Sequence, residues 1–292
     1  MTNNISIKQK IESGVFFSVP GIQDMITAVM AKSIGFEAVY ASGYWLGASA
    51  YGLPDVGITT YTQMLDRVST LVKTMQGTAG VIADADTGYG GLLNMRETVR
   101  GYEAAGVQVI QIEDQEFPKK CGHTRNKRVV PIDVMVKKIK VALEAKTNPN
   151  TLIAARTDAR QGEGFESAMK RMQAYAEAGA DILFPEALKN ETEMRQMCST
   201  ISTPMMANMA DGGNTPILSA ALLEDIGFAF AIFPAATSLA AAEAARQMLT
   251  HIKKTGSSAQ TDVPIYDFNE FCSLIGFEDV WDFERRWVET KD

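Results

Sequence analysis

The chain has 292 residues, of which 46% are hydrophobic and 22% charged, and its formal net charge is −7. This composition is typical of a globular protein with a large core, and the acidic balance excludes a general attraction for nucleic acid or anionic membranes. No apolar run reaches the roughly 20 residues that span a bilayer. The chain has two histidines and three cysteines, which excludes zinc sites with three histidines and argues against a disulfide framework. We expect a cytoplasmic protein without nucleic-acid or membrane partners.

One pattern recurs along the chain. A helix-like segment ends in a small or aliphatic residue followed by glycine, and a short apolar run comes next. The glycines concerned are Gly35, Gly106, Gly179 and Gly227. Glycine just past a helix can adopt the left-handed conformation that closes the last turn, and continuous apolar runs are typical of strands buried on both faces of a parallel sheet.

Eight candidate strands alternate with helical patterns. The strands are expected to end near Ser18, Ser42, Asp84, Glu113, Arg156, Glu186, Asn208 and Pro234. Among the helices, one should begin at Thr60, with Gln63 completing a capping box, and another at Asn94. This alternation predicts right-handed βαβ units and an α/β fold, a (β/α)₈ TIM barrel formed by residues 1–292 as one domain. A doubly wound open sheet is the alternative, although no G-x-G-x-x-G turn follows the first strand.

The C-terminal segment departs from this pattern because it is rich in aromatic residues. Seven of them lie between Tyr266 and Trp287. A solvated tail would not carry so many, so we expect this segment to pack against the barrel of its own chain or against a neighbouring subunit.

Acidic residues follow several of the predicted strands. Asp84 and Asp86 follow the third strand, Glu113 follows the fourth, and Asp55 lies in the turn after the second. Barrel closure would gather these carboxylates around one axis, where they would repel one another unless a cation lay between them. Oxygen ligands without nearby cysteine or histidine favour Mg²⁺, or Mn²⁺, over zinc. Isolated aspartates in such turns more often cap helices, but the clustering here indicates a metal site.

A cationic loop follows the fourth strand. Residues 116–128, here called the cysteine loop, contain five lysines and arginines around Cys121, Gly122 and His123. A solvated charged loop is the commoner outcome for such a run. However, cations and a histidine beside a cysteine lower the pKa expected for its thiol. The segment is therefore a candidate lid over an anionic substrate. Cys198 and Cys272 are expected to be inert packing residues.

Together, these motifs resemble those of the isocitrate lyase and phosphoenolpyruvate mutase superfamily, and in particular those of its short lyase branch. The resemblance covers about residues 15 to 290 in consistent order. The motifs that carry it are Lys119-Lys120-Cys121-Gly122-His123, Ser42-Gly43-Tyr44, Gly52-Leu53-Pro54-Asp55, Asp84-Ala85-Asp86-Thr87-Gly88, Ile112-Glu113-Asp114-Gln115, Ala155-Arg156-Thr157-Asp158-Ala159, Phe184-Pro185-Glu186, Asn208 and Thr215-Pro216.

The resemblance implies a barrel whose eighth helix is exchanged between the subunits of a homotetramer, so that residues 250–292 would pack on a neighbour. It also implies Mg²⁺ held by Asp84, with Asp86, Glu113 and Asp55 contributing directly or through water. The substrate-binding residues that it implies are Ser42, Gly43, Tyr44, Gly122, His123, Arg156, Glu186 and Asn208.

The same resemblance implies carbon–carbon bond cleavage, because the lyases of the superfamily carry the loop cysteine. Cleavage of a 2-hydroxy dicarboxylate leaves an enolate-like carboxylate, and the Cys121 thiol could protonate it at carbon. The metal and Arg156 would stabilise the oxygen that becomes the 2-oxo group, with His123 nearby. Tyr40, at the end of the second strand, is a candidate to help remove the 2-hydroxyl proton, although a carboxylate or water could serve instead.

Several substrates stay open at this point. Bulky Tyr44 and Trp45 would shrink the pocket, and Ala210 stands where the resemblance implies a hydroxyl in methylisocitrate lyases. Both features favour an alkylated malate such as 2,3-dimethylmalate over the tricarboxylate 2-methylisocitrate. Hydrolysis of oxaloacetate is an alternative, and phosphonopyruvate-type P–C bond chemistry is a weaker one. A catalytically silent barrel that binds a dicarboxylate is disfavoured, because the acids, Cys121 and Arg156 are all present.

Overall fold

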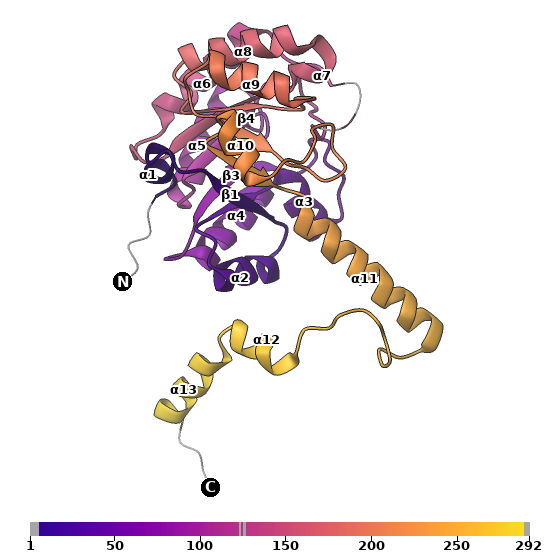
Figure 1. Ribbon diagram of the computed structural model, residues 1–292. Coiled ribbons are helices and arrows are strands. Elements are labelled where there is room, and N and C mark those ends of the chain that lie inside the picture. Colours follow the sequence, from indigo (N-terminus) through magenta and orange to yellow (C-terminus); the bar gives the residue numbers. More distant parts are fainter. Residues whose placement is uncertain (1–5, 123, 125–126, 289–292) are drawn as a thin grey trace.

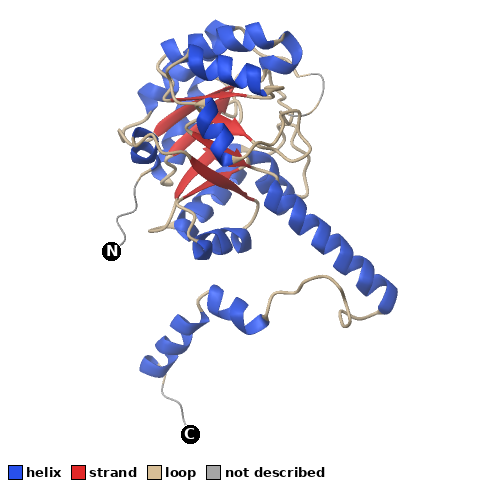
Figure 2. Cartoon of the chain, in the orientation of Figure 1, coloured by secondary structure: helices blue, strands red, loops and turns tan. Residues whose placement is uncertain are grey.

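The computed structural model describes residues 6–122, 124 and 127–288. Eight parallel strands form an inner barrel, and helices surround it (Figures 1 and 2). The strands are β1 (Phe17–Ile22), β2 (Ala38–Ala41), β3 (Gly80–Asp84), β4 (Val109–Glu113), β5 (Leu152–Thr157), β6 (Ile182–Pro185), β7 (Met206–Asn208) and β8 (Phe230–Phe233).

The strand order confirms the predicted barrel. The sheet runs β6-β5-β4-β3-β2-β1-β8-β7, so the first strand pairs with both the second and the last. A single parallel bridge between Leu183 and Met205 joins the two ends of the sheet and nearly closes the barrel. This pairing rules out the open-sheet alternative.

The helices follow the predicted alternation with the strands. They are α1 (Ile7–Glu12), α2 (Met25–Ile34), α3 (Gly43–Tyr51), α4 (Tyr61–Met75), α5 (Leu92–Ala104), α6 (Ile132–Ala145), α7 (Ala159–Glu163), α8 (Phe165–Glu177), α9 (Glu191–Thr200), α10 (Ala220–Ile226), α11 (Ala236–Thr255), α12 (Phe268–Leu274) and α13 (Phe277–Trp287). The four punctuating glycines all have positive φ, as predicted. Thr60 caps α4 and forms the expected capping box with Gln63.

Two predicted boundaries are wrong. Strand β1 continues past Ser18, through Pro20 and Gly21, to Ile22. The glycine permits this because a Cβ at position 21 would lie 2.4 Å from the carbonyl oxygen of Pro234 on the neighbouring β8 segment. Helix α5 begins at Leu92 rather than at Asn94, since the Asn94 side chain accepts a hydrogen bond from the backbone N–H of Gly91, the N-cap.

The core has two parts. Side chains inside the barrel, among them Ile82, Phe184 and Phe230, are fully buried. A larger apolar layer between the strands and the helices includes Val68, Leu71 and Met172. Because both faces of the strands are buried, the backbone ends of the strands are held rigidly, and the loops that follow them carry the polar residues.

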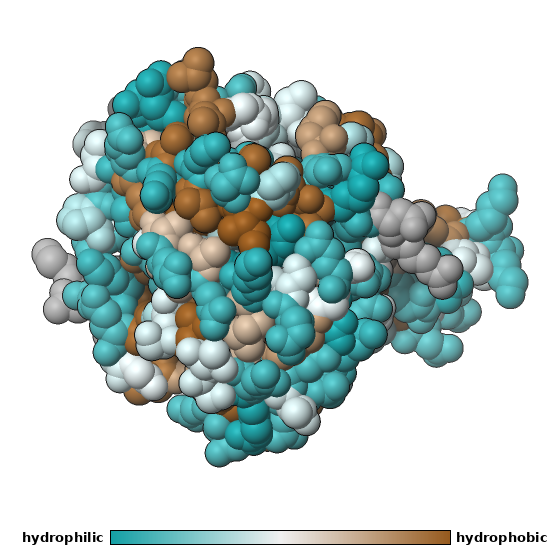
Figure 3. All heavy atoms as spheres, turned by 90° about the horizontal axis from the view of Figure 1, so that it is seen from above, coloured by the Kyte–Doolittle hydropathy of each residue, from teal (hydrophilic) through white to brown (hydrophobic). Residues whose placement is uncertain are grey.

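The C-terminal arm, defined as α11, α12 and α13 with their connections, leaves the barrel. Figure 1 shows α11 projecting away from it, with α12 and α13 below α2, and Figure 3 shows the end of α11 beyond the rim. Phe268, Phe283 and Trp287 are 76%, 61% and 74% exposed. The arm as defined includes all of α11, from Ala236, and the expectation that residues 250–292 pack on a neighbouring subunit stays a prediction. None of the described helices has the length and apolarity needed to cross a membrane.

Candidate active site

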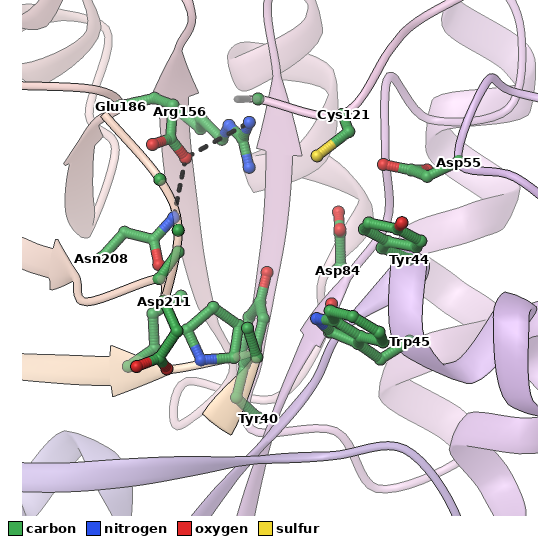
Figure 4. Close-up of a pocket in the computed structure, with 18 of the residues that line it drawn as sticks. Tyr40, Tyr44, Trp45, Asp55, Asp84, Cys121, Arg156, Glu186, Asn208 and Asp211 are labelled. Atoms are coloured by element: carbon green, nitrogen blue, oxygen red, sulfur yellow. Dashed lines mark hydrogen bonds and ion pairs between the residues drawn. The ribbon is translucent and has the colours of Figure 1, made fainter. Parts of the chain in front are cut away.

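One cavity of about 260 Å³ lies at the carboxyl ends of the strands. It brings together most of the residues singled out in the sequence (Figure 4). Those lining it are Tyr40, Ser42, Tyr44, Asp55, Asp84, Glu113, Cys121, Gly122, Arg156, Glu186 and Asn208. Gly43 and Asp86 lie beside Asp84 rather than in the cavity wall, and His123 lies outside the described residues.

Asp84, the last residue of β3, is held by three N–H donors. Its carboxylate accepts from the backbone of Gly43 at 3.3 Å, from the backbone of Asp86 at 3.0 Å and from the Gln111 side-chain amide at 3.2 Å. A Cβ at position 43 would lie 3.0 Å from the Asp84 carboxylate. The start of α3 can therefore approach Asp84 closely because residue 43 is glycine.

Tyr40 points into the cavity from β2, and its hydroxyl donates a 2.9 Å hydrogen bond to the Gln111 side chain. Burial, together with the nearby carboxylate of Asp84, raises the pKa of Tyr40 well above its ordinary value. A phenol that keeps its proton and donates it in a hydrogen bond to Gln111 is a poor base. The geometry thus argues against the suggestion that Tyr40 removes the substrate proton.

Lys119 is buried, although the sequence predicted it only as one of several cations in the cysteine loop. Its ammonium lies 2.5 Å from carboxylate oxygens of both Asp55 and Asp86. Burial alone would lower the pKa of Lys119, but Asp86, Glu113 and Asp55 together raise it well above the ordinary value. The lysine therefore ties the cysteine loop to the turns after β2 and β3. Its position two residues before Cys121 in the motif was the available signal.

Arg156, near the end of β5, lies among three carboxylates. Its guanidinium binds Asp158 through two hydrogen bonds of 2.8 and 3.0 Å, and it lies 3.4 Å from Glu113 and 3.3 Å from Glu186. Burial raises the pKa of Glu113 well above its ordinary value, although Arg156 opposes that rise. Glu186 also accepts a 3.0 Å hydrogen bond from the amide of Asn208. These contacts fix the orientation of the guanidinium toward the cavity.

Lys127, another lysine missed in the sequence, anchors the second half of the cysteine loop. Its ammonium donates to Asp158 at 2.7 Å and to the backbone carbonyl of Gly122. Burial would raise the pKa of Asp158, but Arg156 and Lys127 lower it below the ordinary value. A Cβ on Gly122 would lie 2.1 Å from the guanidinium of Arg156, so only glycine permits this approach.

Cys121 directs its sulfur into the cavity, on the side of Asp55 and Tyr44 (Figure 4). Its backbone N–H donates to the carbonyl of Asp55 at 3.1 Å. The other two cysteines lie outside the cavity wall. Cys272 is buried, and burial raises the pKa of the Cys198 thiol to about 12, as expected for inert packing residues.

The predicted metal ligands converge only in part. Among the described residues, no three Asp, Glu, Cys or His side chains form a ready-made metal cage. Asp55, Asp84 and Glu113 line the cavity, but Asp55 and Asp86 form ion pairs with Lys119. One oxygen of Glu113 is buried and has no hydrogen-bond partner in the described part of the chain. This donor set fits Mg²⁺, which is commonly bound through one or two carboxylates and keeps several waters.

Comparisons with known proteins identify the family of this chain. The phosphoenolpyruvate phosphomutase family profile matches residues 8–253. The chain is 41% identical to the 2,3-dimethylmalate lyase of Eubacterium barkeri, over 99% of each chain. It is 43% identical to the 2-methylisocitrate lyase of Bacillus subtilis, over 93% of this chain and 89% of that one.

Solved structures show the same fold. A crystal structure of 2,3-dimethylmalate lyase, described as a PEP mutase/isocitrate lyase superfamily member, matches with a TM-score of 0.91 at 31% identity, covering 100% of this chain and 97% of that one. Phosphonopyruvate hydrolase, solved with oxalate and Mg²⁺, matches with a TM-score of 0.87 at 28% identity, covering 99% and 100%. The chain therefore belongs to the phosphoenolpyruvate phosphomutase family.

Proposed function

We propose that this protein is a Mg²⁺-dependent carbon–carbon lyase. It cleaves a 2-hydroxy dicarboxylate, of the 2,3-dimethylmalate or 2-methylisocitrate type, to pyruvate and a short carboxylate. The observation that carries this proposal is the cavity that holds the Cys121 thiol, the Arg156 guanidinium and the Asp84 carboxylate together. Similarity to two lyases over nearly the whole chain supports it.

The residues divide between two tasks. We assign Mg²⁺ to Asp84 and Glu113, with Asp86 and Asp55 within reach through water, and Mn²⁺ as a substitute. When bound, the ion supplies Lewis-acid stabilisation of the substrate oxygen that becomes the 2-oxo group. Ser42, Gly43 and Arg156 bind the part of the substrate that becomes pyruvate. Tyr44, Gly122, Glu186 and Asn208 surround the remainder.

Cleavage breaks the bond between C2 and C3 of the substrate. The 2-hydroxyl proton passes to a base, for which the carboxylates lining the cavity are the described candidates. The electron pair of the C–C bond moves onto the departing carboxylate as an enolate, and Cys121 then gives its proton to C3. Arg156 stabilises the negative charge that develops on the oxygens beside it. A thiol that points into the cavity on the side of Asp84 suits this protonation (Figure 4).

We also propose that the C-terminal arm packs on a neighbouring subunit, as part of a homotetramer in the cytoplasm. The exposed aromatic residues of α12 and α13 support this arrangement, since the barrel of the same chain leaves them uncovered.

NMR analysis of the products tests the proposed reaction. Purified protein with Mg²⁺ is supplied separately with 2,3-dimethylmalate, 2-methylisocitrate and oxaloacetate, and each assay is repeated with EDTA. The proposal expects pyruvate with propanoate or with succinate, and loss of both products in EDTA. Oxalate with acetate would instead indicate an oxaloacetate hydrolase. Silence on all three compounds contradicts the lyase assignment.

A further inference from the structure

The two ends of the active-site cavity differ in character. The end beneath the cysteine loop contains Arg156, Lys119 and Lys120, the described cations that line the cavity. The opposite end, here called the β7–β8 end, is formed by the segment after β7, the end of β8 and the start of α11. Its lining includes Ala210, Asp211, Ile232, Pro234, Ala235 and Leu239. Figure 4 shows Asp211 across the cavity from Cys121.

The charges at the two ends are unequal. Arg156 already lies within 3.4 Å of three carboxylates, and Lys119 lies 2.5 Å from two. Among the described residues named for the β7–β8 end, Asp211 is the one that carries a charge. A substrate carboxylate placed beside Asp211 would therefore face a like charge, which is unfavourable.

The rest of the β7–β8 end suits hydrocarbon. Pro234, Leu239 and Ile232 line it, and Tyr44 and Trp45 form an adjacent aromatic wall of the same cavity. The two aromatic rings are stacked, with centroids 4.5 Å apart and planes 8° from parallel. Methyl or methylene groups gain from burial against such surfaces, whereas an ionised group must lose its water.

The position of the reacting atoms directs substituents toward this end. In the proposed reaction, the 2-hydroxyl group of the substrate lies near Asp84 and the carbon that is protonated lies near Cys121. The reacting atoms therefore occupy the end of the cavity beneath the cysteine loop. We propose that the β7–β8 end receives the alkyl substituents of the substrate, and that Asp211 is a specificity-determining residue that disfavours a third carboxylate. This inference rests on the lyase function proposed above and assigns alkylated malates, rather than tricarboxylates, as the substrate class.

Steady-state kinetics test the role of Asp211. The wild-type enzyme, Asp211→Asn and a control, Glu177→Gln, are compared on 2,3-dimethylmalate and 2-methylisocitrate. Glu177 is the exposed last residue of α8, at the other end of the barrel, and the control removes the same charge. We expect wild-type kcat/KM to favour 2,3-dimethylmalate, and Asp211→Asn to narrow that preference by about tenfold, mainly through a lower KM for the tricarboxylate.

Two kinetic outcomes would overturn the inference. One is a wild-type kcat/KM for 2-methylisocitrate equal to or above that for 2,3-dimethylmalate. The other is an Asp211→Asn variant whose preference matches that of Glu177→Gln.

Ligand-observed NMR separates this inference from the proposed reaction. Propanoate and succinate are compared as ligands in the presence of Mg²⁺ and pyruvate, where no cleavage is needed. Tighter binding of propanoate supports an alkyl-accepting end, and tighter binding of succinate overturns it. A wild-type enzyme that cleaves neither substrate but binds propanoate more tightly would contradict the lyase function alone.

Discussion

The barrel and the C-terminal arm bury their apolar residues to very different extents. Phe184 and Phe230 in the barrel are completely buried, whereas Phe268 and Trp287 in the arm are 76% and 74% exposed. Exposed aromatic residues in such number are typical of a surface that contacts another chain. This difference supports the proposals that the chemistry lies in the barrel and that the exposed aromatic residues of α12 and α13 contact a neighbouring subunit. Substitutions in the barrel should therefore change catalysis, whereas substitutions in α12 and α13 should change the oligomeric state.

Replacing the loop thiol should give the largest effect and leave assembly untouched. In Cys121→Ser, kcat should fall by about 10²- to 10⁴-fold, because a hydroxyl is a much weaker proton donor to carbon than a thiol. Mg²⁺-dependent binding of pyruvate, measured by calorimetry, should persist. Cys198→Ala provides the matched control and should keep near-normal kcat. Near-normal turnover of Cys121→Ser would remove this residue from the acid role.

Loosening the cysteine loop should give the next largest effect. Lys127→Met removes the charged hydrogen bonds to Asp158 and to the Gly122 carbonyl. Such bonds contribute about 1.5–3 kcal/mol, so kcat/KM should fall roughly 10- to 100-fold. Lys137→Met is the control, since Lys137 forms an exposed ion pair with Asp133 on the surface of α6. Equal kinetics of the two variants would show that the Lys127 contacts do not position Cys121.

Disrupting the arm should change mass rather than chemistry. The double change Phe283→Asp with Trp287→Asp places charge on the exposed side of α13. Light scattering after gel filtration should show the assembled wild type and a variant with at most half its mass. Glu284→Gln, an exposed change on the same helix, should leave the mass unaltered. A monomeric wild type would contradict the role given to the arm.

The smallest expected effect comes from replacing one of the glycines that end the helices of the barrel. Gly106 has a φ of +93°, and a Cβ there would lie 3.0 Å from a methyl group of Val72. Gly106→Ala should lower the free energy of unfolding by about 1–2 kcal/mol in a urea titration. Gly162→Ala within α7, where φ is not positive, is the control and should be neutral or slightly stabilising. An equal response of both variants would argue against the strain at Gly106.

Local sequence features predicted much of the barrel because they act over a few residues. The glycines at positions 35, 106, 179 and 227 and the capping box at Thr60 depend on neighbours along the chain, and both features were found. The continuation of β1 through Pro20 and Gly21 depends instead on how closely β8 approaches. Asn94 has the side chain of an N-cap, yet it serves Gly91 from the first turn of α5.

The site shows the same division between local and tertiary information. Motifs at the strand ends located Asp84, Glu113, Arg156 and Cys121, because barrel closure brings all strand ends together. The carboxylate partners of Lys119 and Lys127 were not predicted. A long, flexible side chain can reach several carboxylates, and the folded structure decides which of them it contacts. Asp211 was missed for a related reason: the sequence showed an acid in a turn, without its place opposite Cys121.

Tyr40 is the donor in its hydrogen bond with Gln111, and this direction limits which ligand groups the Tyr40 hydroxyl can bind. The phenol has one proton, which it donates in its hydrogen bond to the Gln111 amide oxygen. Toward the cavity it can therefore offer only lone pairs. A ligand atom resting against it must bring its own hydrogen, which an alcohol does and a ketone does not. Gln111, whose amide N–H in turn donates to Asp84, thus orients the phenol so that the Tyr40 hydroxyl favours an alcohol group over a ketone in front of it.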